Sequence, residues 1–154
     1  MTLIVSAPGT APATTDYVKE IHFTAPPEKV FDALTTLTGL ASWWVPVTGS
    51  GAEGAELRFT FGAGQTLVAH VQEANRPSTV IWHVMFCDVE PDWVGTSPTF
   101  TLTPAGDGGS ELTFRHKGLG PHLECYDQCR AGWDHFLPSL HSYVESGTGT
   151  PTRA

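Results

Sequence analysis

Three side chains near the start of the last third of the chain have the types and the spacing that bind metal ions. His122, Cys125 and Cys129 follow one another at helical intervals, so a helix would carry all three on one face. A facing strand would then supply the fourth ligand of a tetrahedral zinc site, with the candidates Cys87, Asp88 and His116. Free cysteine is also among the most buried residue types and packs as a small apolar side chain. We favour this packing interpretation, so the three residues stay weak metal candidates and no cofactor is expected.

Acid–base catalysis is the second chemistry that the residues suggest. His116 shares a strand face with the apolar residues Leu112 and Phe114, because alternate residues of a strand point the same way. An inward-facing His116 could act as a general acid or base, or activate a cysteine thiol, and it is a weak catalytic candidate. His83 is the other histidine considered for this role. The sequence contains no phosphate-binding glycine loop followed by lysine, no nucleophile elbow and no His-Glu-x-x-His motif, which disfavours those enzyme classes.

Aromatic residues recur at positions where they would converge on a cavity. An apolar pocket with a few oriented polar groups is the general form of a small-molecule site. The predicted ligand-binding residues are Trp43, Trp44, Trp82, His83, Phe86, Trp93, Phe100, Phe114, His116, Cys129, Trp133 and Phe136. The alternative is that the rings only fill a core, which we expect for about half of them. A bulge shifts the parity of a strand, so the choice between Trp82 and His83 as the pocket-facing residue stays open.

The chain is acidic, with 16 Asp and Glu against 8 Lys and Arg and a net charge of −8. This balance disfavours nucleic acid and anionic membrane as partners, because both need a basic footprint. Three of the acids form a loop at residues 88–92, which could gate a cavity or bind a cation but would ordinarily be only solvated. No apolar run reaches the roughly 20 residues of a membrane span and no signal peptide is evident, so a cytoplasmic location is expected. The 3 cysteines are expected to be reduced thiols.

Hydrophobic spacing and turn residues indicate the elements that must position these side chains. Strands are predicted at residues 17–24, 56–61, 65–73, 79–87, 96–103 and 110–117. Two short helices are expected between the first two strands, the first entered through Pro26 and Pro27. A long amphipathic helix is predicted over residues 124–147, with Pro138 bending it on the solvent face. We expect a flexible arm at residues 1–15, one folded domain at 16–147 and a tail at 148–154.

The sequence resembles the START/Bet v 1-like (SRPBCC) superfamily, and within it the C-terminal domain of the Hsp90 ATPase activator Aha1. The resemblance spans roughly residues 17–151, and its carriers are the segment 25–34, the pair Trp43-Trp44, the strand 111–118, and Gly132-Trp133 followed by Leu137, Leu140, Tyr143 and Gly147. It implies an α+β helix-grip fold. In that fold a six-stranded, curved antiparallel sheet wraps around the long C-terminal helix, with a cavity between them and two short helices between strands one and two.

Three functions follow as hypotheses. The first is binding of a small hydrophobic or aromatic molecule in the cavity, which needs no catalytic residues and makes an enzyme the less favoured choice. The second is an enzyme of the cyclase, aromatase or hydrolase kind that uses His116 or His83. The third, implied by the resemblance, is interaction with an Hsp90-type chaperone. The oligomeric state is left open between monomer and homodimer.

Overall fold

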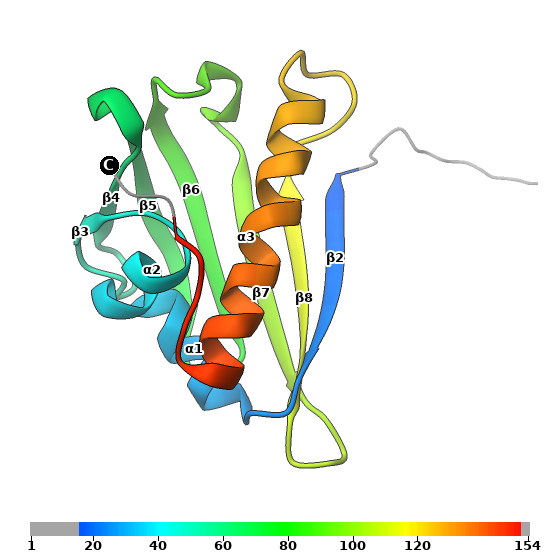
Figure 1. Cartoon of the computed structure of the whole chain (residues 1–154). Helices are drawn as coiled ribbons and strands as arrows, with labels where there is room; N and C mark the ends of the chain where they lie inside the picture. The colour runs from blue at the N-terminus through cyan, green and yellow to red at the C-terminus, as the bar shows by residue number, and fades with distance from the viewer. Residues whose placement is uncertain (1–15, 152–154) are drawn as a thin grey trace, which may run out of the picture.

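A curved antiparallel sheet wraps around one long helix in the computed structural model, which describes residues 16–151 (Figure 1). The seven strands lie in the order β2-β8-β7-β6-β5-β4-β3. The long helix α3 crosses one face of the sheet, and the short helices α1 and α2 lie on the same side. The elements are β2 (Tyr17–Phe23), α1 (Pro27–Thr35), α2 (Leu37–Trp43), β3 (Val47–Gly49), β4 (Glu56–Thr60), η1 (Gly62–Gly64), β5 (Thr66–Asn75), β6 (Thr79–Cys87), η2 (Pro91–Trp93), β7 (Ser97–Pro104), β8 (Ser110–Lys117) and α3 (Tyr126–Ser146).

The α+β helix-grip fold is confirmed, and one part of the prediction is corrected: the sheet has seven strands instead of six. The additional strand, β3, has only 3 residues and pairs with β4. So short a segment cannot show the alternation by which strands are recognised, and it contains a glycine, which is depleted in strands. Its pairing with β4 therefore decides its conformation.

The long helix packs through a stripe at helical spacing, as predicted. Its buried residues include Cys129, Trp133, Leu137, Leu140 and Val144. The helix ends where Gly147 adopts the left-handed conformation, with φ of 86°, which glycine reaches without steric cost. Along residues 16–151, neither this helix nor another is both long and apolar enough to cross a membrane.

Pro138 lies within α3 and on its exposed face, as the spacing predicts. A proline there removes one backbone N–H donor, but the helix continues to Ser146. Because the position is exposed, water can satisfy the Asp134 carbonyl that loses its partner.

Ser139, on the neighbouring position, is a polar residue buried against the core, with 2 % of its surface exposed. Its hydroxyl donates to the Trp43 carbonyl at 2.8 Å and accepts from the Thr150 N–H at 2.7 Å. Residues just after the predicted domain boundary at 147 are thus attached to α3, while the boundary itself stays a prediction. The predicted arm at 1–15 and residues 152–154 of the predicted tail lie outside the described residues.

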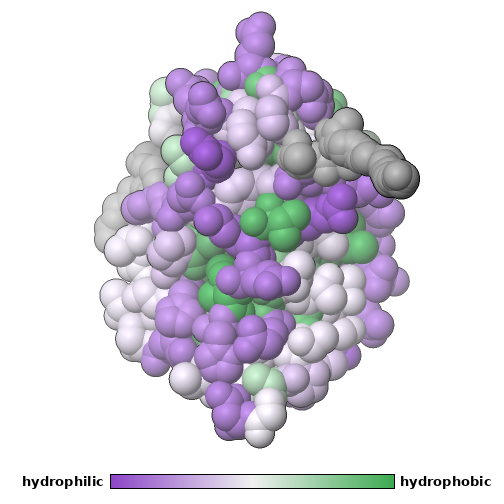
Figure 2. Space-filling model, turned by 90° about the vertical axis from the view of Figure 1, so that its right-hand side faces the viewer, coloured by the Kyte–Doolittle hydropathy of each residue, from purple (hydrophilic) through white to green (hydrophobic). Residues whose placement is uncertain are grey.

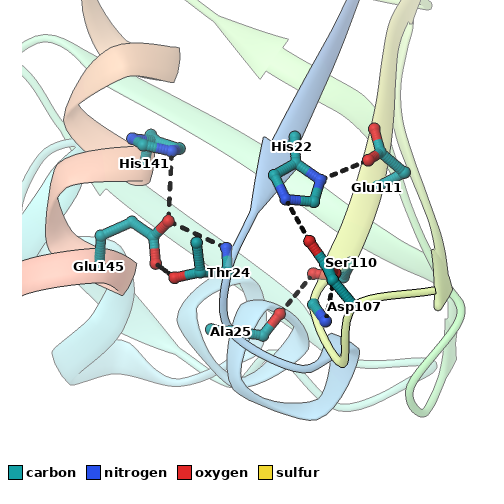
Figure 3. Close-up of polar contacts among 9 residues, drawn as sticks. His22, Thr24, Ala25, Asp107, Ser110, Glu111, His141 and Glu145 are labelled. Carbon is teal, nitrogen blue, oxygen red and sulfur yellow. Dashed lines mark hydrogen bonds and ion pairs between the residues drawn. The ribbon is translucent and has the colours of Figure 1, made fainter. Parts of the chain in front are cut away.

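Ionisable side chains connect β2 and the residue after it to β8, to the turn before β8 and to α3 (Figure 3). His22 on β2 places Nδ1 against the Glu111 carboxylate and Nε2 3.2 Å from the Asp107 carboxylate. A ring with an acceptor at each nitrogen is best satisfied as the imidazolium, and the hydrogen bond to Glu111 raises the pKa of His22. On the other side, Glu145 of α3 accepts from the Thr24 backbone N–H at 2.9 Å.

The double role of Ser139 predicts that Ser139→Ala destabilises the fold by about 1 to 2 kcal/mol, because it removes a hydroxyl that serves a buried carbonyl and a backbone N–H. Ser146→Ala is the matched control on the same helix. The Ser146 hydroxyl is exposed, donates to the Ser142 carbonyl and accepts from the Thr148 N–H only at 3.4 Å, so the substitution should change stability by less than about 0.5 kcal/mol. Urea unfolding of both variants measures the difference. Equal effects would contradict the structural role of Ser139.

The position of His22 predicts a pH dependence of known sign. Folding raises the pKa of His22. Its contribution to the stability of the folded protein is therefore complete below the unfolded pKa of 6.5 and is lost as the pH rises through the folded pKa. The urea midpoint of the wild-type protein should therefore exceed that of the His22→Gln variant by a larger amount at pH 6 than at pH 9. A difference that does not vary with pH would disprove the ion pairing.

Candidate functional site

A pocket of about 200 Å³ opens between α3, the η2 loop and the sheet. Five aromatic rings line it, those of Trp44, Phe61, Trp93, Trp133 and Phe136. The remaining lining residues are Leu67, Cys87, Val89, Glu90, Gln128, Cys129 and Gly132. The cavity is therefore mainly apolar and aromatic, with few polar groups at its wall.

Three tryptophans from separate parts of the chain form its frame. Trp44, which follows α2, lies with its ring 5.2 Å from the ring of Trp133 on α3. Trp93 of η2 stacks on Trp133 with the ring planes 12° apart, and its indole N–H donates to the Cys129 Sγ at 2.9 Å. The rings therefore fix one another, and the pocket lies where α2, α3 and η2 meet.

Five of the predicted ligand-binding residues line this pocket: Trp44, Trp93, Cys129, Trp133 and Phe136. Four others are buried in the core instead, as the alternative reading expects for some rings: Trp43, Trp82, Phe100 and Phe114. Trp43, for example, donates its indole N–H to the Ala33 carbonyl at 2.8 Å. Whether any of the five contacts a ligand stays a prediction.

His83 and Phe86 are corrections, because both lie on the face of β6 that points away from α3. Trp82 is buried and His83 faces outward, where its Nδ1 meets the Ser97 hydroxyl at 3.1 Å. In the pairing of β6 with β5, Ala69 opposes Val84 and Val68 opposes Phe86, so Met85 is an extra residue. This bulge reverses the parity of the strand, which leaves Phe86 50 % exposed and turns Cys87 inward.

His116 is also a correction, since it is buried behind the pocket and does not line it. The Trp133 indole N–H donates to its Nδ1 at 2.9 Å, and an indole nitrogen cannot accept. The neutral ring therefore has its proton on Nε2, which donates to the Thr96 hydroxyl at 2.8 Å. That hydroxyl donates in turn to the Trp93 carbonyl at 2.6 Å.

The burial of His116 lowers its pKa to about 3, because a charged ring would lose its hydration without gaining a counter-charge in contact. Both nitrogens are engaged in this hydrogen-bond chain. A general acid or base needs a free nitrogen within reach of the substrate, so the geometry gives His116 a structural position and no access to the pocket.

The predicted metal ligands are only partly brought together. His122 is exposed and does not join the group. Glu90 takes its place, and its carboxylate and the sulfur atoms of Cys125 and Cys129 lie within 4.8 Å of one another. Burial raises the pKa of both thiols, which keeps them protonated. Three such ligands can hold a thiophilic cation with one position open, and among residues 16–151 no fourth ligand belongs to the group.

The expected fourth ligands are engaged elsewhere. Asp88 accepts from the Thr66 N–H at 2.7 Å, and Cys87 accepts from the Glu90 N–H at 3.3 Å. His116 is held by Trp133 and Thr96, as described above. None of the expected fourth ligands therefore joins Cys125 and Cys129, and whether the two cysteines only pack or bind a metal stays a prediction.

Several pocket residues were not predicted, among them Phe61, Gln128 and Gly132. Phe61 immediately follows β4, where the strand pattern ends, and Gln128 and Gly132 carry no apolar signal. The sequence indicates the acidic loop at 88–92, but the spacing of its acids does not show that Glu90 lines the cavity.

A second groove lies between β2 and α3, on the side of the molecule that Figure 2 shows, where hydrophobic atoms are surrounded by hydrophilic ones. Its wall includes Lys19 and Asp134, whose charged groups are 3.7 Å apart, and the Tyr17 hydroxyl donates to the same Asp134 carboxylate. These groups satisfy one another at the surface. The aromatic pocket, which lacks such pairing, is the stronger candidate site.

The lowered pKa of His116 predicts acid sensitivity. In acid the unfolded chain binds a proton at His116 that the folded protein does not bind. The contribution of His116 to the free energy of unfolding is therefore complete above pH 6.5 and falls as the pH decreases toward 3, by at most about 1.4 kcal/mol per pH unit. His116→Phe should show a shallower acid dependence. Imidazole nitrogen NMR on the wild-type protein should show the Nε2–H tautomer without titration over about pH 5 to 8; a midpoint near 6.5 would disprove the hydrogen-bond chain.

Comparisons with known proteins agree with this architecture. The family model described as "Activator of Hsp90 ATPase homolog 1-like protein" matches residues 24–145. No curated protein matches the sequence.

Several solved structures are similar. The Aha1 dimer from Colwellia psychrerythraea has 29 % identity and a TM-score of 0.76, and the match covers 88 % of this chain and 99 % of that one. A protein of Mesorhizobium loti has 25 % identity and a TM-score of 0.73, with 83 % and 95 % covered. DynU16, a protein in the dynemicin biosynthetic locus, shares the fold at 24 % identity and a TM-score of 0.68, with 86 % of this chain and 48 % of that one covered.

The family match spans most of the described residues, and the sheet, the two short helices and α3 have the arrangement that the resemblance implied. The chain therefore belongs to the Activator of Hsp90 ATPase homolog 1-like family, within the START/Bet v 1-like superfamily.

Proposed function

We propose that the protein binds a small hydrophobic or aromatic molecule in the pocket beneath α3. The observation that carries the proposal is the aromatic lining of the cavity of about 200 Å³ at the edge of the core. An apolar opening bounded by five rings and a few polar groups has the form of a ligand site.

The size of the cavity limits the affinity. Burying about 200 Å² of apolar ligand surface contributes roughly 5 kcal/mol at 25 cal/mol per Å². Part of this gain offsets the lost freedom of the ligand, so an unoptimised ligand of one or two rings should bind with a Kd no tighter than about 0.2 mM. Neutral naphthylethanol is a suitable first probe.

An enzymatic role has less support. Two histidines were candidates for catalysis. His116 lies behind the pocket, and His83 lies on the opposite face of the sheet. Burial raises the pKa of Cys129, the thiol that lines the cavity beside Trp93. The Glu90 carboxylate lies within 4.8 Å of its sulfur, but a carboxylate is too weak a base to ionise a thiol whose pKa is raised, and a protonated thiol is a weak nucleophile.

A second candidate function, interaction with an Hsp90-type chaperone, is favoured by the family match and by the similarity to Aha1 from Colwellia psychrerythraea. That relative is described as a dimer, which keeps a homodimer beside a monomer as a candidate state. Measuring the ATPase rate of Hsp90 with and without the purified chain tests the interaction. Light scattering coupled to gel filtration tests the oligomeric state.

Gly132 offers a direct test of the pocket. A Cβ added at Gly132 meets no atom within 4 Å, and the residue lines the cavity. Gly132→Leu should therefore fill the pocket and weaken naphthylethanol binding at least about tenfold. The fold should be retained, since leucine is a better helix former than glycine by roughly 1 kcal/mol. Calorimetric titration gives the affinity.

Ala131→Leu is the matched control, because Ala131 precedes Gly132 on α3 and is exposed. It adds the same side chain to the same helix outside the cavity and should leave naphthylethanol binding unchanged. If both variants bind the probe as the wild type does, the pocket is not the binding site.

A further inference from the structure

The charges at the pocket are of one sign. Among residues 16–151, Glu90 is the one carboxylate that lines it, and no Lys, Arg or His of that range lines it. The other polar lining groups are the Gln128 amide and the thiols of Cys87 and Cys129. A bound ligand would therefore meet a negative group and no positive one.

Within the part of the chain that the structure describes, Glu90 takes part in no ion pair. Partial burial raises its pKa, and the nearby carboxylates of Asp92 and Glu124 raise it further. A carboxylate that is partly withdrawn from water and surrounded by like charges is stabilised by any cation that comes into contact with it.

The aromatic rings of the pocket, like Glu90, favour a positively charged ligand. Each ring has a negative face, which attracts a cation that lies within about 6 Å of the ring centre. Trp93, three residues after Glu90 in the chain, stacks on Trp133, and the ring of Trp44 lies 5.2 Å from that of Trp133. Carboxylate and rings thus line one small space.

We propose that the ligand of this pocket is a hydrophobic amine in its protonated form, with the ammonium group at the Glu90 carboxylate and the hydrocarbon part among the aromatic rings. This inference rests on the proposed function and names its ligand class. A carboxylate ligand of the same shape is rejected, because it would bring a second negative charge beside Glu90 in a site of low polarity. A bare metal ion at Glu90 would leave the aromatic wall without a role.

Three probes with the same ring system separate charge from shape: naphthylethylammonium, naphthylethanol and naphthylacetate. Calorimetric titration near pH 7.5, with a chelator present to remove metal ions, should give affinities in that order. We expect the ammonium probe to bind about tenfold more tightly than the alcohol, and the carboxylate to bind more weakly than both.

Glu90→Gln removes the charge and keeps the shape of the side chain. It should weaken ammonium binding about tenfold, leave alcohol binding within about twofold and strengthen carboxylate binding. Glu56→Gln is the matched control, because Glu56 is an exposed residue of β4 away from the pocket and its loss changes the net charge by the same amount. It should leave the order of the three probes unchanged.

The outcomes separate the two proposals. If the alcohol binds and Gly132→Leu abolishes that binding, but the ammonium probe has no advantage or keeps it in Glu90→Gln, the pocket function stands and the amine inference is overturned. If none of the three probes binds the wild-type protein, the proposed function fails and the inference fails with it.

Discussion

The neutral ring of His116 connects the parts of the structure that form the pocket. It lies on β8, accepts from Trp133 on α3 and reaches the η2 loop through Thr96 and the Trp93 carbonyl. A protonated ring could not accept from the indole, so the chain of hydrogen bonds exists only with neutral histidine. Complete burial keeps it neutral. The sheet, the helix and the loop therefore hold a common geometry over the pH range in which most proteins function.

Aromatic packing then sets the size of the cavity. Rings fill much of the space between the sheet and α3. Trp82 stacks against Trp44 with the ring planes 6° apart, and the ring centres of Phe100 and Phe114 lie 4.9 Å apart. The Trp82 indole N–H lacks a partner among the described residues, a cost of about 1 to 3 kcal/mol that is offset by burial of the large ring. What remains open lies at the edge of the core, between η2 and α3. A ligand held there is necessarily small.

Much of the fold could be predicted from local patterns. The stripe on α3, the proline entry of α1 and the turn residues between strands act over a few positions, and the structure retains them. Strand faces were predictable only while the alternation lasted. At Met85 a single additional residue reverses it, and its position depends on pairing with β5. The uninterrupted alternation therefore predicts Phe86 in the pocket and misses Cys87, which lines it.

The sequence by itself determined the α+β order of strands and helices, the aromatic character of the interior and the acidity of the loop at 88–92, because these follow from composition and short-range spacing. The helix-grip arrangement was implied by the family resemblance. The tertiary structure decided which of these groups meet. Glu90 joins Cys125 and Cys129 across 35 and 39 positions of chain, where helical spacing had suggested His122. His116 became a buried connection because Trp133 and Thr96 close on its two nitrogens. Such contacts depend on how separate elements pack, and no local pattern records them.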